Sequence, residues 1–144
     1  DIAWLRSQWD GPFMVKGVSR IDDAKRVVDL GATALSVSNH GGNNLDGTPA
    51  PIRALPAVVD AVGSQIEVVL DGGVRRGAHI VKALALGADA VSFGRPTLYS
   101  LAAGGEKGVD RMITLMREEL ERDLALVGCA KVRDLNDSYI RVRA

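Results

Sequence analysis

Residues 87–94 read GADAVSFG and residues 31–38 read GATALSVS, so one short pattern occurs twice in the chain. In both copies a glycine ends a helical stretch, a short turn follows, and an apolar strand begins, as repeated strand–helix units require. The whole chain continues this alternation. Strands are expected at residues 13–16, 34–38, 67–71 and 90–94, and helices at 21–30, 51–62, 77–86 and 109–127. Such an alternation is typical of parallel strands joined by helices.

Four strand–helix units are half of an eight-unit barrel, which usually needs about 250 residues. We therefore expect an α/β fold in which residues 1–144 form the C-terminal half of a (β/α)8 TIM barrel. The opening at Asp1, without an initiator Met, favours a chain cut inside a larger protein. The expected partner is an N-terminal half-barrel, in the same protein or supplied by association. Four side chains are expected to face the barrel interior, which would be open on one side: Val15, Leu35, Val69 and Val91.

The composition excludes several classes of protein. The 144 residues carry 18 basic and 18 acidic side chains, so no broad positive field favours binding to nucleic acid. The apolar runs are too short to span a bilayer, and no secretory signal is visible. With Cys129 as its one cysteine, the chain has no internal disulfide, and we expect a cytoplasmic location.

Polar residues and glycines follow each of the four expected strands. The strand ends read KG at 16–17, SNHGG at 38–42, DGGVR at 71–75 and GRP at 94–96. In barrels of this kind the active site lies at the C-terminal ends of the strands. The four segments are therefore expected to converge on one site.

The last two strand ends combine glycines with arginines. Gly72, Gly73 and Gly94 allow backbone N–H groups to approach an anion closely, and Arg75 and Arg95 carry guanidinium groups that match phosphate oxygens. Loops after strands seven and eight commonly bind phosphate in this fold. The pattern predicts a phosphate site, against the alternative of plain turns and surface charges.

Two other strand ends carry residues suited to acid–base chemistry. His40 follows an apolar strand and precedes two glycines, where a histidine is a candidate general base near neutral pH, although a structural turn residue is an alternative. Lys16 ends an apolar strand, and a buried ammonium there needs an anionic or electron-rich partner. His79 falls inside an expected helix and is interpreted as structural or exposed. Cys129 is interpreted as a packing residue, and no metal site is expected.

Four segments together resemble a known family. Residues 38–42, 45–47, 70–77 and 90–96 are similar to the signature segments of the FMN-dependent 2-hydroxy-acid oxidases and dehydrogenases. The resemblance runs from Trp4 to about Leu135. It implies a flavoprotein oxidoreductase with FMN as cofactor, a small-molecule or peptide-derived substrate and a homo-oligomeric assembly.

The resemblance also implies a role for each matching residue. Lys16 would lie near N1 and O2 of the flavin, Ser38 would contact the flavin or its surroundings, and His40 would be the base that also touches the substrate. The ribityl phosphate would be held by Asp71, Gly72, Gly73, Arg75, Gly94 and Arg95. The carboxylate partner of the histidine in this family belongs to an earlier strand, outside this chain.

One position departs from the family. The usual pattern is His-Gly-Gly-Arg, in which the arginine binds the substrate carboxylate, but this chain has Asn43. An asparagine lacks both the charge and the forked geometry for that task, and Arg53, in the next helix, is a weak substitute. Asn43 with Asn44 resembles the pre-mycofactocin synthase branch, which implies oxidative deamination of a Val-Tyr-derived intermediate, with Asn43 binding a neutral amide.

Three alternatives remain open at this point. The first is an L-lactate or other 2-hydroxy-acid dehydrogenase or oxidase of the same family. The second is another phosphate-binding barrel, such as the inosine-monophosphate dehydrogenase group, although its cysteine loop is not matched. The third is an inactive half-barrel that associates with itself. By itself, the 144-residue chain is expected to bind FMN weakly or not at all.

Overall fold

The computed structural model describes residues 1–141 as alternating helices and strands. The strands are β1 (Met14–Val18), β2 (Ala34–Val37), β3 (Glu67–Asp71) and β4 (Ala90–Ser92). The α-helices are α1 (Ile2–Gln8), α2 (Ile21–Asp29), α3 (Pro51–Val62), α4 (Gly77–Ala85) and α5 (Arg95–Val127). Short 3-10 turns occur at η1 (His40–Gly42), η2 (Val132–Asp134) and η3 (Asp137–Tyr139). Among residues 1–141, no helix is both long and apolar enough to cross a membrane.

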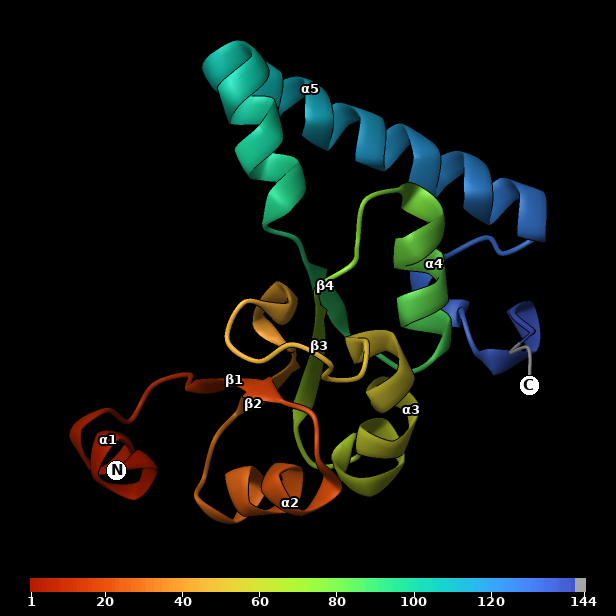
Figure 1. Cartoon of the computed structure of the whole chain (residues 1–144). Coiled ribbons are helices and arrows are strands. Elements are labelled where there is room, and N and C mark those ends of the chain that lie inside the picture. The colour runs from red at the N-terminus through yellow and green to blue at the C-terminus, as the bar shows by residue number, and fades with distance from the viewer. Residues whose placement is uncertain (142–144) are drawn as a thin grey trace.

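The four strands form one sheet in sequence order, and all neighbours are parallel. Figure 1 shows α2 and α3 side by side against the strands, with α4 beside β4. Each helix returns the chain to the start of the next strand, as parallel pairing requires. The predicted α/β architecture of four strand–helix units is confirmed, and all strand ends that carry the candidate site lie at one edge of the sheet.

The apolar core lies between the sheet and its helices. Register places Val15 beside Leu35 and Leu35 beside Val68, and all three belong to this core with side chains of α2 and α3. The interior set predicted above is therefore wrong for Val15, Leu35 and Val91, which pack towards the helices. Side chains alternate along a strand, so the open face is the one that carries Val69.

The open face of the sheet is more polar than predicted. Alternation puts Lys16, Ser36 and Asp71 there, in register with their neighbours on adjacent strands. Ser36 is almost fully buried, yet its hydroxyl has no hydrogen-bond partner within the described residues 1–141. The inner surface of the half-barrel is therefore polar near the C-terminal ends of the strands.

Helix α5 is longer than the predicted helix at 109–127. It begins at Arg95, directly after β4, and its backbone leaves helical geometry at Gly104 and Gly105. The two glycines divide α5 into a first limb, residues 95–103, and a second limb, residues 106–127. The predicted helix corresponds to the second limb only, where Met112 and Met116 are buried. Figure 1 shows the first limb rising from β4 and the second limb crossing the start of α4. The pair of glycines explains the bend, because Gly105 adopts a positive φ of 59°.

Candidate functional site

The centre of the site is the carboxylate of Asp71 at the end of β3. Lys16 Nζ lies 2.8 Å from Asp71 Oδ2, and the Ser38 hydroxyl donates to the same oxygen over 2.5 Å. On the other side, the Ser92 hydroxyl donates to Asp71 Oδ1, also over 2.5 Å. All four strands thus contribute one polar side chain, or the residue that follows the strand, to a single cluster. Ser92 is a member that the sequence analysis missed.

The environment of Asp71 favours its ionised form. Burial raises the pKa of the Asp71 carboxyl, but the hydrogen bonds from Lys16, Ser38 and Ser92 outweigh burial and hold it below its ordinary value of 3.8. The ionised carboxylate of Asp71 is the anionic partner that Lys16, at the end of its strand, was predicted to need. Lys16 is therefore fixed in position while its side chain remains 44% exposed to the cavity.

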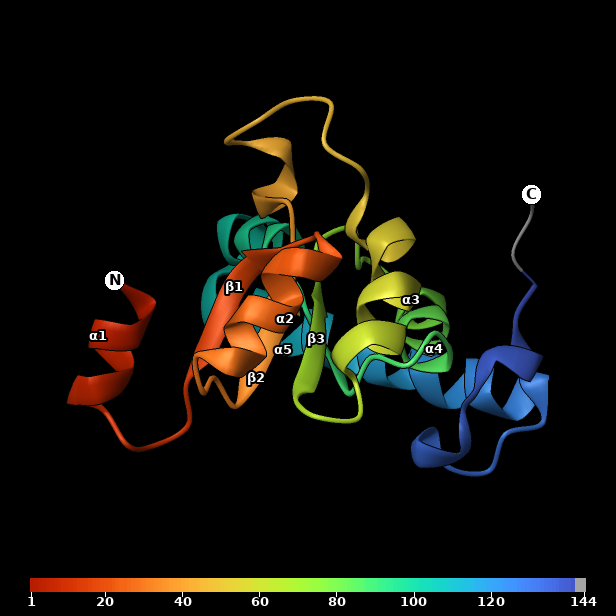
Figure 2. The same cartoon turned by 90° about the horizontal axis from the view of Figure 1, so that it is seen from below.

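His40 lies on the loop that follows β2. Its backbone N–H donates to Ser38 Oγ over 3.1 Å, which ties the loop to the Asp71 cluster. His40 has a φ of 54°, a left-handed conformation that costs energy for any residue except glycine. Figure 2 shows the whole loop from β2 to α3 projecting beyond the sheet.

Gly17 provides the space for the imidazole ring. The backbone of β1 bulges between Lys16 and Val18, and Gly17 has a φ of 104°. A Cβ atom at Gly17 would lie 2.6 Å from His40 Cε1. The ring therefore rests against the backbone of β1, next to the residue that carries the cation. Gly17 is a second residue that the sequence analysis did not single out.

The two glycine–arginine segments come together as predicted. A cavity of about 450 Å³ opens at the C-terminal ends of β3 and β4. Its lining includes nine of the ten predicted site residues: Lys16, His40, Asn43, Asp71, Gly72, Gly73, Arg75, Gly94 and Arg95. The tenth, Ser38, is buried behind Asp71 and Lys16. Arg53, the weak substitute for a substrate-binding arginine, is not among the residues that line this cavity.

The loop after β3 is held by residues outside the cavity. His79 Nδ1 accepts the backbone N–H of Arg75 over 3.1 Å, so this histidine has the structural role predicted for it. Glu119 of α5 contacts Arg76 and the backbone of Gly77. Glu119 lies far from the site in sequence and follows no strand, so the sequence pattern contained no signal that pointed to it.

A comparison with known protein families identifies the chain. The model described as FMN-dependent dehydrogenase matches residues 1–142. The chain belongs to this family. Its cofactor is FMN, as predicted, and the match favours this family over the inosine-monophosphate dehydrogenase alternative.

Curated relatives show which members the chain is similar to. It is 61% identical over 135 residues to the pre-mycofactocin synthase of Mycolicibacterium smegmatis, covering 94% of this chain and 34% of that protein. It is 49% identical over 142 residues to the L-lactate oxidase of Nostoc sp., covering 99% of this chain and 39% of that protein. The chain thus spans little more than a third of the length of the relatives it matches.

Solved structures confirm the barrel fold. A crystal structure of mandelate oxidase with benzoyl-formic acid superposes with a TM-score of 0.90 at 43% identity, over 94% of this chain and 41% of that one. A mandelate oxidase variant with a monooxide FMN adduct superposes with a TM-score of 0.89, again at 43% identity, over 94% of this chain and 44% of that one. The predicted fold class is therefore confirmed for this chain.

The cavity suits the phosphate end of FMN. A Cβ atom built at Gly73 or Gly94 meets no atom within 4 Å, so the backbone on this side is open to a ligand. Arg75 and Arg95 line the same space, and neither forms a salt bridge with a carboxylate of residues 1–141. Two guanidinium groups beside open glycine backbone are the donor set that a phosphate dianion requires. The residues fit the cofactor.

Proposed function

We propose that residues 1–144 form the C-terminal half of an FMN-dependent oxidoreductase and that a second half-barrel completes the site. Two features support the second half. The sheet has four of the eight strands of such a barrel, and the chain covers only 34–36% of the length of the pre-mycofactocin synthases that it matches. We call this chain together with its complementary half the completed barrel. The isolated chain is proposed to be inactive, because it contains only one side of the cavity.

Each residue of the site has a proposed task in the completed barrel. Arg75 and Arg95 bind the phosphate by charge-assisted hydrogen bonds. Lys16, oriented by Asp71, lines the cavity with a positive charge that would stabilise the anionic reduced form of the cofactor. Bound FMN supplies the two-electron oxidant. His40 accepts the proton that the substrate releases, through an imidazole that lines the cavity and lies against Gly17.

The proposed substrate is an amine or amide derived from a peptide, as in mycofactocin biosynthesis. The observation that carries this proposal is Asn43, an exposed neutral residue on the cavity wall at the position where the family usually has an arginine. An amide side chain both donates and accepts hydrogen bonds, so it suits a neutral amide better than a carboxylate. Identity supports the same branch: 60–61% to pre-mycofactocin synthases, against 46–50% to the oxidases and dehydrogenases of 2-hydroxy acids.

Substrate choice is tested by anaerobic bleaching of the bound flavin. The protein is the natural completed barrel, or this chain fused behind the corresponding N-terminal part of the Mycolicibacterium smegmatis relative. The panel contains a Val-Tyr-derived cyclic amine, L-lactate, glycolate and (S)-mandelate. We expect rapid bleaching with the amine and slow bleaching with the three acids. Rapid reduction by any of the acids would overturn the argument from Asn43 and favour the 2-hydroxy-acid alternative.

One variant distinguishes the contribution of Asn43 to substrate choice from that of the other pocket residues. Asn43→Arg restores the charge and the forked geometry that bind a carboxylate. If Asn43 is the main determinant, this variant gains reduction by L-lactate and loses affinity for the amine. A variant that loses the amine without gaining any acid indicates that further residues of the complementary half also determine specificity.

A further inference from the structure

The loop that carries Arg75 is bonded to helix α5 through Glu119, a residue that does not line the cofactor cavity. Glu119 Oε1 accepts a hydrogen bond from Arg76 Nε over 2.7 Å, and Glu119 Oε2 accepts the backbone N–H of Gly77 over 2.8 Å. The two oxygens of one carboxylate therefore hold the last residue of the loop and the first residue of α4. Figure 1 shows α5 crossing α4 at this end.

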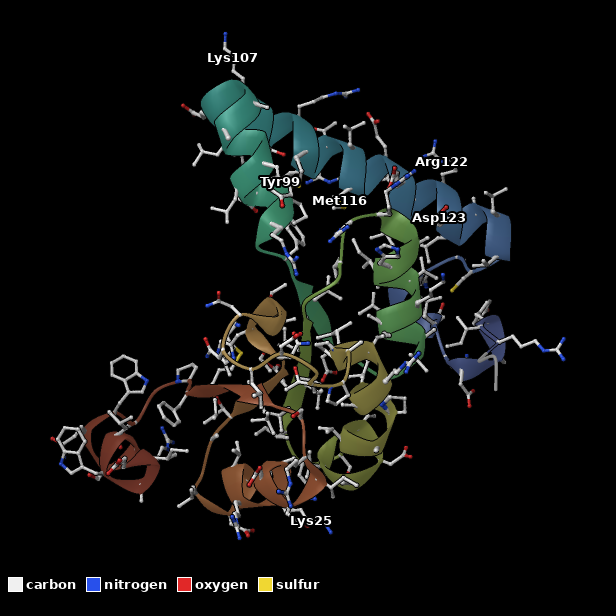
Figure 3. The ribbon with its side chains drawn as sticks, in the orientation of Figure 1. Lys25, Tyr99, Lys107, Met116, Arg122 and Asp123 are labelled. Atoms are coloured by element: carbon white, nitrogen blue, oxygen red, sulfur yellow. The ribbon has the colours of Figure 1, made fainter. Side chains whose placement is uncertain are left out.

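The two helices touch through their backbones at this point. A Cβ atom on Gly77 would overlap the backbone nitrogen of Leu120 and the backbone carbonyl carbon of Glu119. Only a glycine permits this approach, so the position of α5 relative to the start of α4 has little freedom. Figure 3 labels Arg122 and Asp123 on the part of the same limb that passes the start of α4.

The carboxylate is ionised and mostly shielded from solvent. Hydrogen bonds from Arg76 and from the Gly77 backbone hold the pKa of the Glu119 carboxyl below its usual range. Its side chain is 18% exposed, while the Arg76 side chain is 68% exposed. Because Glu119 approaches from the second limb of α5, it connects the loop to an element more than forty residues away in the chain.

The two consecutive arginines of this loop differ in the cavities that they line. Arg75 lines the 450 Å³ cofactor cavity, whereas Arg76 and Glu119 do not. Arg76 and Glu119 line a second cavity of about 690 Å³ between the two limbs of α5, which Arg75 also borders. Figure 3 shows Tyr99, another residue of that lining, on the first limb facing the second. Arg75 thus borders both cavities, whereas Arg76, paired with Glu119, borders the second cavity and not the cofactor cavity.

From this geometry we propose that Glu119 is a positioning residue for the FMN phosphate. It does not touch the cofactor cavity. It acts through Arg76 and the Gly77 N–H, which fix the turn that presents Arg75 and Gly73 to the phosphate. A loop ordered before the ligand arrives binds more tightly, because the ligand need not supply the cost of ordering it. This inference rests on the proposed function, in which Arg75 binds phosphate.

The test compares FMN with riboflavin, which lacks the phosphate, in the completed barrel. The variants are Glu119→Ala, Glu119→Gln and the control Glu118→Gln. Glu118 is the neighbouring residue, and its side chain is 56% exposed. Its one salt bridge among residues 1–141 is a long one to Arg111, at 3.9 Å. Dissociation constants are measured by quenching of flavin fluorescence, together with the unfolding temperature of each apoprotein.

We expect Glu119→Ala to weaken FMN binding by about threefold to tenfold, the effect of one additional side chain that must be ordered on binding. Glu119→Gln should lose less, because its amide oxygen still accepts the Gly77 N–H. Riboflavin binding should change by less than about twofold in every variant, and Glu118→Gln should resemble the wild type.

The possible failures are distinguishable. If the wild type binds riboflavin as tightly as FMN, the proposed phosphate site itself is wrong. If the wild type prefers FMN but Glu119→Ala weakens both ligands equally, Glu119 has only a general structural role and the inference is overturned. An unchanged preference for FMN in Glu119→Ala, with or without a lower unfolding temperature, overturns it as well.

Discussion

The two ends of the site differ in how completely this chain builds them. At the phosphate end, Arg75 lies on a short loop that is held by His79 and by Glu119. At the substrate end, His40 and Asn43 lie on a long exposed loop, and the His40 ring forms no hydrogen bond with any other described residue. In the proposed function, this chain therefore holds the phosphate end of the site in place by itself, whereas the substrate end would be completed by the complementary half.

The largest expected effect is a loss of flavin reduction without a loss of bound flavin, on substitution of His40. His40→Ala in the completed barrel should lower the rate of flavin reduction by about 10²- to 10⁴-fold, since it removes the proposed base. Flavin content should stay at that of the wild type, because His40 is not part of the phosphate contacts. The rate is measured by anaerobic stopped-flow absorbance and the content by the visible flavin bands. Loss of FMN together with activity would indicate that the two ends are not separable.

Substitutions at the phosphate end should weaken FMN binding and leave the rate of flavin reduction nearly unchanged. Arg75→Gln and Arg95→Gln should each weaken FMN binding by about 10- to 100-fold, the effect of losing one charge-assisted hydrogen-bonding group. At saturating FMN, the rate of flavin reduction should recover to near that of the wild type. Arg53→Gln is the matched control, because Arg53 is exposed on α3 and lines neither cavity. A control variant that weakens FMN equally would show that total charge, not these two positions, governs affinity.

A smaller effect is expected where β1 meets the histidine loop. Gly17→Ala places a Cβ atom against His40 Cε1 and strains a backbone with φ of 104°, so flavin reduction should slow by about tenfold. Gly47→Ala is the control: Gly47 also has a positive φ, of 76°, but a Cβ atom there meets nothing within 4 Å. Equal slowing in both variants would assign the effect to backbone strain rather than to the position of the imidazole.

The smallest effect concerns the cluster that joins the two ends. Asp71 has a pKa below its ordinary value of 3.8, so its contribution to stability is present above about that pH and is lost as the pH falls through the folded-state pKa. Asp71→Asn should therefore lower the free energy of unfolding at pH 7 by about 1 kcal/mol. The difference should vanish in strong acid. Urea unfolding between pH 2.5 and pH 7 measures it, with exposed Asp10→Asn as the control. A difference independent of pH would contradict an ionic role for Asp71.

The strand ends made most of the site predictable from the sequence. Parallel strands place their C-terminal ends at one edge, so reading the residue after each strand was enough to collect Lys16, His40, Asp71, Arg75 and Arg95. The bounds of β3 and α3 were also predicted without error. Local patterns succeed here because apolar periodicity and glycine stops determine where strands and helices begin and end.

The unpredicted parts depend on contacts between distant segments. The set of inward residues was wrong because strands buried on both faces have no clear polar alternation in sequence, as in the four buried residues of β2. The first limb of α5 was missed because Gly104 and Gly105 interrupt its pattern. Glu119 acts across a helix contact made possible by Gly77, and Ser92 is recognisable only once β3 and β4 are paired.

In the proposed function, this chain carries a site for FMN that is specific for the phosphate. The most direct test is the ratio of the dissociation constants of riboflavin and FMN for the completed barrel, in the wild type and in the double variant Arg75→Gln/Arg95→Gln. We expect the wild type to prefer FMN by at least about 100-fold, because both proposed phosphate-binding arginines are charged, and we expect a ratio near one in the double variant. Equal binding of the two flavins by the wild type would contradict it.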